Sequence, residues 1–500
     1  RDVERSRGLG DVYKRQMIIE GQSEKPVYLL IKDRDVEIRD ADKYWGMLTD
    51  TAQKHLSMDT GLRDAQIAVI GPAGENLVRY ASVIVTPRRA FGRGGAGAVM
   101  GSKKLKAIVV KATNRSMEVN DRDKLTEVIK KMIKTLKEEP STGELYPTYG
   151  TNQLTSVINE LGFYPTRNFQ NGVFNEIDKV HEKTWREKYV IKDDGCFTCT
   201  VRCWKLALVR EGPYTGSITD GPEYETTWAL GAQCGNSRLD SIISGDELCD
   251  LYGLDTITMG NTIGFVMELY ERGLITEEQT DGLDFRFGNH EAIIEAIKRT
   301  ALKLGKLGEL LGKGVRKISE EVGQGSEGFA IHVKGLELPA YDPRGAWGMG
   351  LAYATSNRGG CHLKAWTVGD EAIRGTVPRW STEGRPELVI KIQNQRSVNN
   401  SLGICLFITK GLPWDMYPDV IDAVTGMKFT PDELLRVGAR IYTLERVITT
   451  RQGVNRKDDT LPSRITDEPI PEGPSGGKKL AREDLEQMLN RYYELRGWDE

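Results

Sequence analysis

The first hundred residues carry short apolar runs separated by polar or glycine-containing turns, a pattern that is typical of β-strands. Residues 28–31 and 36–39 flank a polar turn and predict a hairpin. Further apolar runs at 66–70, 80–85 and 105–110 predict three more strands. This part of the chain is therefore expected to form a sheet.

The pattern changes near residue 120, where apolar positions begin to recur every three to four residues. Residues 125–136 follow an Asn/Asp cap and precede Pro140, which predicts a helix that ends before the proline. Helical patterning also dominates 244–272 and 290–321, and a final amphipathic helix is expected over 482–495. Residues 460–477 are rich in Pro, Gly and Ser and predict an extended connector.

These patterns predict an α+β protein, and a length of 500 residues fits about three domains. Residues 17–118 are expected to be the remaining part of an N-terminal β domain, followed by two mainly α-helical domains over 119–334 and 335–500. Residues 1–16 begin with Arg, are highly charged and resemble a translated sequencing adapter, so we interpret them as a non-native scar. The natural start of the protein is accordingly expected to be missing.

Composition narrows the functional classes. Lys and Arg number 69 against 72 Asp and Glu, for a net charge of −3, which argues against a dedicated nucleic-acid binder. No run approaches ~18 uninterrupted apolar residues, so a membrane-spanning helix is not expected. The 54 glycines follow no collagen-like period and predict tight turns and close approaches of backbone to ligand. Seven cysteines are too few for a disulfide scaffold.

Three of those cysteines lie close together, at Cys196, Cys199 and Cys203. Iron–sulfur clusters are held by Cys thiolates, commonly three neighbours and one remote, whereas structural zinc sites usually pair their ligands two and two. The spacing therefore favours an iron–sulfur cluster over zinc. It cannot choose the remote ligand, for which the remaining candidates are Cys234, Cys249, Cys361 and Cys405.

A second candidate is the glycine-dense segment from Gly92 to Gly97, which contains Arg93. Glycines let backbone groups approach an anion closely, and an Arg can donate two hydrogen bonds to a phosphate. The segment lacks the GKS/T of a Walker motif and the strand–helix context of a dinucleotide-binding GxGxxG. Taken alone, it predicts an anion-binding loop only weakly.

Seven segments together carry a resemblance to a known family. They are GRGGAGAVMGSKKLKAI (92–108), PTRNF (165–169), CFTCTVRC (196–203), GPEYET (221–226), CDLYGLDTI (249–257), YATSNRGGCH (353–362) and SLGIC (401–405). In this order the chain resembles the tungsten-dependent aldehyde:ferredoxin oxidoreductases. The resemblance implies a β-sheet pterin-binding domain, two helical domains, a tungsten (or molybdenum) bis-pyranopterin, a bridging magnesium and a [4Fe-4S] cluster. It also implies an N-terminal portion, ahead of the position of Met17, that contacts the pterin phosphates and magnesium.

The resemblance assigns roles residue by residue. It makes Cys405 the remote cluster ligand beside Cys196, Cys199 and Cys203. It implies cofactor contacts at Arg93, Gly94 and Gly95, at the DxxGL(D/C) motif Asp250, Gly253, Leu254 and Asp255, and at a second such motif, Asn400, Gly403 and Ile404. The second motif departs from the family, because Asn400 stands where a carboxylate is expected. Asn offers one acceptor and one donor in place of two acceptors, which predicts weaker binding of a pterin amino edge.

For catalysis, the resemblance assigns the base to Glu225 and the group that orients the substrate carbonyl to His362. The implied reaction oxidises an aldehyde to a carboxylate and sends the electrons to ferredoxin, in the cytoplasm and without a membrane or nucleic-acid partner. Family members often form homodimers through a small metal site, whose ligands this sequence does not reveal. Two alternatives stay open: a tungsten-dependent aromatic-ring reductase of the benzoyl-CoA type, with Cys361 beside His362 as a metal ligand, and a non-catalytic iron–sulfur electron-transfer protein.

Overall fold

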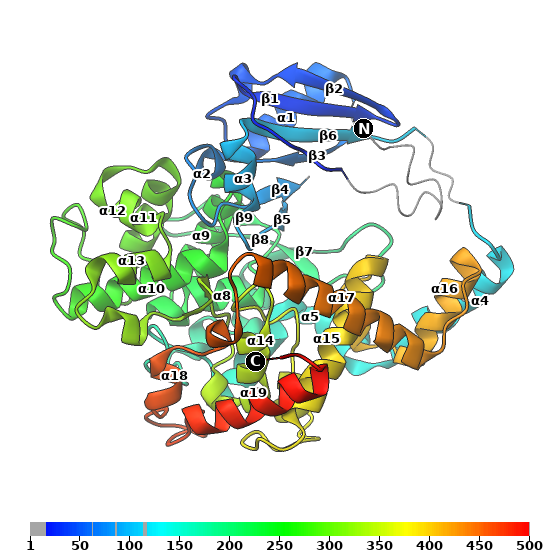
Figure 1. Cartoon of the computed structure of the whole chain (residues 1–500). Coiled ribbons are helices and arrows are strands. Elements are labelled where there is room, and N and C mark those ends of the chain that lie inside the picture. The colour runs from blue at the N-terminus through cyan, green and yellow to red at the C-terminus, as the bar shows by residue number, and fades with distance from the viewer. Residues whose placement is uncertain (1–16, 63, 86–87, 114–117, 500) are drawn as a thin grey trace.

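The structure of the chain is a computed structural model that describes residues 17–62, 64–85, 88–113 and 118–499. Residues 1–16, which we interpreted as a scar, lie outside the described residues. Figure 1 shows a sheet from the N-terminal part lying on a larger helical body, with the C-terminal helix at the opposite side. The predicted α+β class is confirmed.

The N-terminal sheet has six strands among the described residues, in the order β2-β1-β6-β3-β4-β5. The strands are β1 (Val27–Lys32), β2 (Asp35–Asp40), β3 (Gln66–Val69), β4 (Val83–Val85), β5 (Arg89–Phe91) and β6 (Leu105–Lys111). β1 and β2 form the predicted antiparallel hairpin, and β6 pairs parallel to β1 and antiparallel to β3. Helix α1 (Thr49–Thr60) packs on the sheet through Ala52 and Leu56, while Met100 of α3 (Ala96–Ser102) packs with Leu29 and Leu105.

The predicted strand 80–85 is shorter than expected, because its first residues contact the helical body instead of the sheet. Tyr80 donates its hydroxyl to Leu311 O at 2.9 Å, and Ser82 N donates to Gly253 O at 2.9 Å. Backbone groups that would extend a ladder are thus used to join the sheet to the helices. Only Val83–Val85 remain as a strand.

The helical body contains helices in the two predicted ranges and others that the sequence patterns did not predict. The predicted range 244–272 holds most of α9 (Leu239–Tyr252) and all of α10 (Thr256–Glu271), and the range 290–321 holds α11 (His290–Leu302), α12 (Gly305–Leu311) and all but the last residue of α13 (Val315–Val322). The helices that were not predicted include α5 (Tyr146–Tyr149), α6 (Leu154–Glu160), α7 (Glu182–Lys188), α8 (Tyr224–Leu230), α14 (Trp347–Thr355) and α15 (Arg385–Leu402). A small sheet of β7 (Val190–Asp194), β8 (Trp204–Leu208) and β9 (Ile218–Thr219) carries the cysteine segment, and β10 (His332–Val333) pairs with β11 (Leu336–Glu337).

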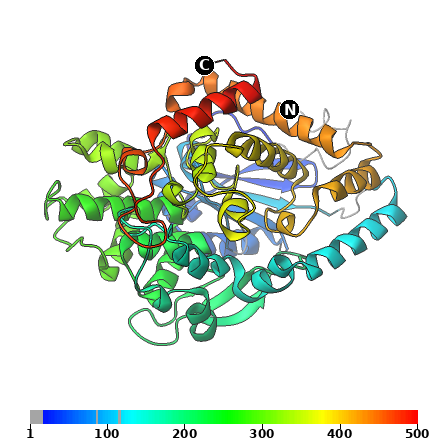
Figure 2. The same cartoon turned by 90° about the horizontal axis from the view of Figure 1, so that it is seen from below.

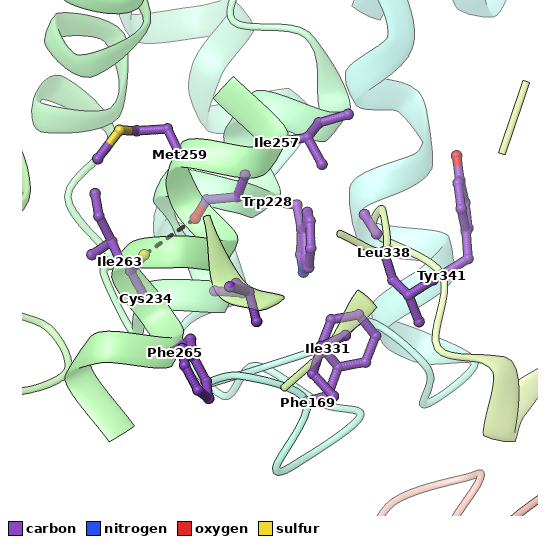
Figure 3. Packing of buried hydrophobic residues seen from close by; sticks show 14 of the residues in the cluster. Phe169, Trp228, Cys234, Ile257, Met259, Ile263, Phe265, Ile331, Leu338 and Tyr341 are labelled. Carbon is purple, nitrogen blue, oxygen red and sulfur yellow. Dashed lines mark hydrogen bonds between the residues drawn. The ribbon is translucent and has the colours of Figure 1, made fainter. Parts of the chain in front are cut away.

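One hydrophobic core runs through this body from residue 73 to residue 493. Figure 3 shows Trp228 of α8 near its centre, with the ring of Phe169 edge-on at 5.9 Å between centroids. Cys234 belongs to the same core, where its thiol donates to Ala229 O. Because both helical regions contribute to one core, they pack as a continuous body.

Helix α4 (Arg122–Glu138) begins at the N-cap Asp121, whose side chain accepts from Lys124 N, and ends before Pro140 as predicted. It packs against α16 (Tyr417–Thr425) in a separate apolar cluster that includes Leu136 and Tyr417, at one side of the body (Figure 1). A helix from the 119–334 region therefore rests on one from the 335–500 region.

The C-terminal part is formed by α17 (Pro431–Arg451), which begins with a capping box at Thr430, and α19 (Arg482–Arg496). Figure 2 shows α19 in red beside the yellow elements of the third region, and it contacts α14 and α15. The predicted connector over 460–477 is interrupted by the short helix α18 (Ser463–Asp467), because Arg464 is buried by an ion pair with Glu268. None of the described helices is both long and apolar enough to cross a membrane.

Candidate active site

The four cysteines that the resemblance assigned to the cluster come from two segments of the chain. Cys196, Cys199 and Cys203 lie between β7 and β8, and Cys405 follows α15. Burial raises the pKa of the Cys203 thiol, and the nearby Glu223 and Cys405 raise it further. Burial also raises the pKa of Cys405, to which Cys196 and Cys199 add. The remaining cysteines, Cys234, Cys249 and Cys361, are buried elsewhere.

A single-ion site does not account for this arrangement. In the described part of the chain, no three His, Cys, Asp or Glu side chains converge as ligands of one metal ion. Cys196 and Cys405 are exposed, Cys199 and Cys203 are partly exposed, and Cys405 interacts electrostatically with the other three. Three thiols close in sequence and one remote thiol fit the donor set of an iron–sulfur cluster.

Arg89, on β5, is a cation beside the cysteines that the sequence analysis missed. Its guanidinium lies 4.6 Å from the ring of Trp204, the residue after Cys203, and pairs with Asp220 at 2.8 Å. The sequence signal that could have identified Arg89 is its position three residues before the glycine-dense segment. Arg202 and Lys205, which flank the cysteines in sequence, are held instead at Asp193: Arg202 donates to Asp193 O, and Lys205 Nζ lies 3.6 Å from its carboxylate.

A cavity of about 450 Å³ lies beside these cysteines, between the N-terminal sheet and the helical body. Its wall includes Arg93, Glu225, Asp250, Asp255 and His362, which come from both regions. The structure therefore brings the predicted catalytic pair and the first pterin motif to one space.

Glu225 and His362 lie next to each other in the wall of that cavity. His362 Nε2 lies 3.7 Å from Glu225 Oε1, and Glu225 Oε2 accepts from Ala340 N at 2.9 Å. Burial raises the pKa of Glu225 to about 8, and burial lowers the pKa of His362 well below its usual value. Glu225 Oε1 and His362 Nδ1 are buried without a hydrogen-bond partner among the described residues. Such orphaned groups are rare unless a ligand completes them.

Glu223, the neighbouring candidate for the base, is placed differently. Its carboxylate accepts from the Thr151 hydroxyl and lies 3.5 Å from Arg89, toward the cysteine side. Its side chain is 37% exposed, whereas that of Glu225 is 14% exposed. Glu225 therefore matches the requirements for a base shielded from solvent better than Glu223 does.

Arg93 makes protein contacts that the sequence did not reveal. Its Nη1 donates to Gly360 O at 2.6 Å, its Nη2 donates to Glu337 O at 2.7 Å, and its Nε contacts Asp255 at 3.3 Å. The guanidinium thus joins three segments beside the cavity. A phosphate at this loop would therefore be bound by the guanidinium N–H groups that these contacts leave free and by the backbone N–H groups of the loop.

The two DxxGL-type motifs share one local structure, a helix C-terminus closed by a left-handed glycine. Gly253 (φ 76°) ends α9 and Gly403 (φ 68°) ends α15. In each, the next residue closes a 6→1 hydrogen bond: Leu254 N donates to Cys249 O at 2.8 Å, and Ile404 N donates to Asn399 O at 2.9 Å. The structural role that both motifs share is therefore to cap the C-terminus of a helix.

The motifs open onto different cavities. Asp250 borders the cavity of Glu225 and His362, whereas Asn400 borders a second one of about 390 Å³. Cys361 borders the second cavity and His362 the first, while Leu363 borders both. The RGGCH segment thus forms a wall between the two spaces.

Gly94 and Gly95 border a third cavity of about 380 Å³ with a basic wall. Both have positive φ, and a Cβ built on Gly94 would meet nothing within 4 Å, so the loop leaves open space there. The wall carries a group of cations that the sequence did not single out: Arg79, Lys313, Arg316, Lys317, Lys334 and Arg358. This donor set, the orphaned Glu225 and His362 atoms and the convergent thiols fit an anionic pterin cofactor with an adjacent cluster.

Comparison with known proteins agrees with this geometry. The family description "Aldehyde ferredoxin oxidoreductase, N-terminal domain" matches residues 10–112, and "Aldehyde ferredoxin oxidoreductase, domains 2 & 3" matches residues 127–500. The chain is 45% identical to a tungsten-containing aldehyde ferredoxin oxidoreductase of Pyrococcus abyssi, over 97% of this chain and 79% of that protein. The corresponding protein of Pyrococcus furiosus is 41% identical over the same shares.

More distant relatives differ in chemistry. An aliphatic sulfonate oxidoreductase subunit of P. furiosus is 33% identical over 97% of this chain and 78% of that protein. The active-site complex of a benzoyl-coenzyme A reductase shares the fold, with a TM-score of 0.78 at 22% identity over 96% of this chain and 78% of that one. Since the matches of at least 41% identity and both family descriptions agree, the chain belongs to the aldehyde ferredoxin oxidoreductase family.

Proposed function

We propose that this chain is a tungsten-pterin oxidoreductase that converts aldehydes to carboxylic acids and delivers the electrons to ferredoxin. The observation that carries the proposal is the pairing of Glu225 and His362, whose Oε1 and Nε2 lie 3.7 Å apart, while Glu225 Oε1 and His362 Nδ1 have no hydrogen-bond partner among the described residues. The 45% identity to a tungsten-containing aldehyde ferredoxin oxidoreductase supports the same reaction.

The reaction consumes one aldehyde and one water and yields one carboxylic acid, two protons and two electrons. A bound tungsten pterin supplies two-electron chemistry, and an iron–sulfur cluster supplies one-electron transfer. His362, neutral because burial lowers its pKa, can donate a hydrogen bond to the aldehyde oxygen. Glu225 can take the proton of the attacking water, since a base is most effective when its pKa lies near the working pH.

The cofactor would be held by residues of both regions. We assign the cluster to Cys196, Cys199, Cys203 and Cys405, and the pterin contacts to the two helix-end motifs and the loop of Arg93. Magnesium between the pterin phosphates is assigned to the backbone of Gly94 and Gly95, beside the basic third cavity. Cys196 and Cys405 are exposed, whereas the Glu225 side chain is only 14% exposed, which supports electrons leaving on the cysteine side.

The ring-reductase alternative has less support. It requires Cys361 as a metal ligand near His362, yet Cys361 borders the second cavity and not the one that holds Glu225. We therefore retain aldehyde oxidation. A cytoplasmic location, as expected of an enzyme whose thiols serve a cluster, and a homodimer remain part of the proposal.

The test is Glu225→Gln in protein loaded with cofactor. It removes the base and keeps the shape, so tungsten and iron contents should stay unchanged while kcat falls by about 10²–10⁴. Glu223→Gln is the matched control and should retain most activity. Equal turnover in Glu225→Gln and wild-type protein would show that Glu225 is not the base.

A further inference from the structure

The cavity of Glu225 and His362 contains a lysine that no part of the proposed reaction uses. Lys410 follows the cluster segment, in the turn Ile408–Lys410, and its Nζ lies 3.4 Å from the centre of the Trp366 ring. Its backbone N–H donates to Phe407 O, but among the described residues its ammonium group makes no hydrogen bond or ion pair. Asp370, the carboxylate that acts on it electrostatically, is instead hydrogen-bonded by Arg374 Nη2 at 2.7 Å.

The surroundings of Lys410 make this lack of a partner costly. The nearby wall is apolar and aromatic, with Leu363, Trp366 and Phe407 among its residues. Burial lowers the pKa of Lys410 well below its usual value, and the positive charges of Arg396 and Arg374 lower it further. The Trp366 ring favours the charged form through its π face, but a ring is a weaker partner than a carboxylate.

A row of rings leads from Lys410 to the proposed chemistry. The Tyr341 ring lies 6.0 Å from that of Trp366 and 6.0 Å from that of His362. All these residues border the same cavity. A substrate whose carbonyl meets His362 can therefore lay its chain along the rings and present its far end to Lys410.

We infer that Lys410 is a specificity-determining residue that binds a carboxylate at the far end of the substrate, so that the preferred substrates are aldehydes that also carry an acid group. The inference rests on the proposed aldehyde oxidation. Binding such a substrate would give the lysine the partner it lacks. A neutral aldehyde would leave that group unmatched, and sites built for a polar group discriminate strongly against analogues without it.

The test compares two pairs of aldehydes of equal chain length, butanal with 4-oxobutanoate and hexanal with 6-oxohexanoate. In cofactor-loaded enzyme, Lys410→Met should lower kcat/KM for at least one acid aldehyde by about 10- to 100-fold and change that of its neutral partner by less than threefold. Lys410→Arg should retain most of the preference. Lys391→Met, which removes an exposed charge from α15, is the matched control.

A binding measurement separates this inference from the proposed function. Titration calorimetry with succinate and adipate should show weaker binding to Lys410→Met than to wild-type protein and the control variant. If a diacid binds through Lys410 but no aldehyde is oxidised, the proposed function is wrong and the anion site stands. If aldehydes are oxidised while Lys410→Met changes neither the preference nor the binding, the inference is overturned.

Discussion

The ends of α9 and α15 use the same backbone to present different chemistry. In each, a left-handed glycine is followed by an apolar residue, and the next position receives backbone hydrogen bonds. Asp255 accepts from Ile257 N at 3.1 Å and thereby caps α10, while the Cys405 sulfur accepts from the backbone of Phe407 and Ile408. One cap geometry thus positions a carboxylate at one end and the thiol of a proposed cluster ligand at the other.

The two ends differ in what supports them. The α9 end is tied to the N-terminal sheet: Ser82 N donates to Gly253 O, and Asp255 N donates to Tyr80 O at 3.1 Å. A Cβ on Gly71 would lie 2.3 Å from Tyr252 O, so backbone meets backbone there. Around Gly403, a Cβ would meet nothing within 4 Å. The first motif is therefore a structural joint as well as a proposed cofactor contact, and the second is free to serve the cofactor alone.

The largest expected effect tests the chemistry at the second end. Cys405→Ser replaces the proposed thiolate with a poor iron ligand, so the visible absorption of the [4Fe-4S] cluster should be lost or converted and iron per chain should fall. Cys234→Ser is the control, because that thiol is buried in the core, where it donates to Ala229 O and Gly260 O. An unchanged cluster spectrum in Cys405→Ser would show that Cys405 is not a cluster ligand. The ends of α9 and α15 would then no longer differ in the chemistry proposed for them.

Alanine at the two glycines tests the structural part of the comparison. Gly253→Ala should lower the free energy of unfolding by roughly 2–4 kcal/mol, since it adds a Cβ 3.0 Å from Gly71 N to the cost of left-handed backbone. Gly403→Ala should lower the free energy of unfolding by only about 1–2 kcal/mol, because the left-handed backbone is strained but the added Cβ meets no neighbour. Denaturant titration of both variants measures the difference, and equal losses would contradict it.

Exchanging the first residues of the motifs tests cofactor binding. Asp250→Asn should weaken retention of tungsten by about 1–3 kcal/mol, the range for a hydrogen bond left unmade. Asn400→Asp should strengthen it, by less, because Asn400 is exposed. Metal analysis after dialysis against a chelator measures both. Stronger retention in Asp250→Asn would reverse the assignment of the two sites.

The smallest effect concerns pH. Burial, with the nearby charge of Asp220, raises the pKa of Asp246 on α9 to about 7, whereas the second motif carries no carboxylate at Asn400. The raised pKa means that the folded state holds this proton more tightly than the unfolded state does. Its stabilising contribution is full below about pH 3.8 and is lost as the pH rises to about 7. Asp246→Asn should flatten this part of the stability profile, and Asn400→Gln should leave it unchanged.

The sequence predicted those elements whose stabilising contacts lie close together along the chain, and it missed those that depend on distant residues. The β1–β2 hairpin, the α4 cap and the helices over 244–272, 290–321 and 482–495 have local causes, and their patterns predicted them. The late start of the strand, after Tyr80–Ser82, and the short α18 depend on partners far along the chain, at Gly253 and Glu268, which no local pattern contains.

The same limit applies to the candidate site. The family motifs pointed to the cysteines, Glu225 and His362, and the structure places these residues together, although their roles stay proposals. Arg89 and Lys410 lie next to motifs without belonging to them, and only the folded chain shows what surrounds them. The internal contacts of Arg93 were equally hidden, because its partners are up to 267 positions away.

The long-range contacts of Arg93 also determine when the glycine-dense loop can fold during translation. The arginine leaves the ribosome well before its partners Asp255, Glu337 and Gly360, the last of them 267 residues later. At about 5–20 residues per second, that interval is on the order of 10–50 s. During it, the sheet can pair its strands while the glycine loop lacks the groups that hold it. The glycine loop is therefore among the last parts of the molecule to take its shape, and a cofactor that needs this loop would be inserted after translation of the third region.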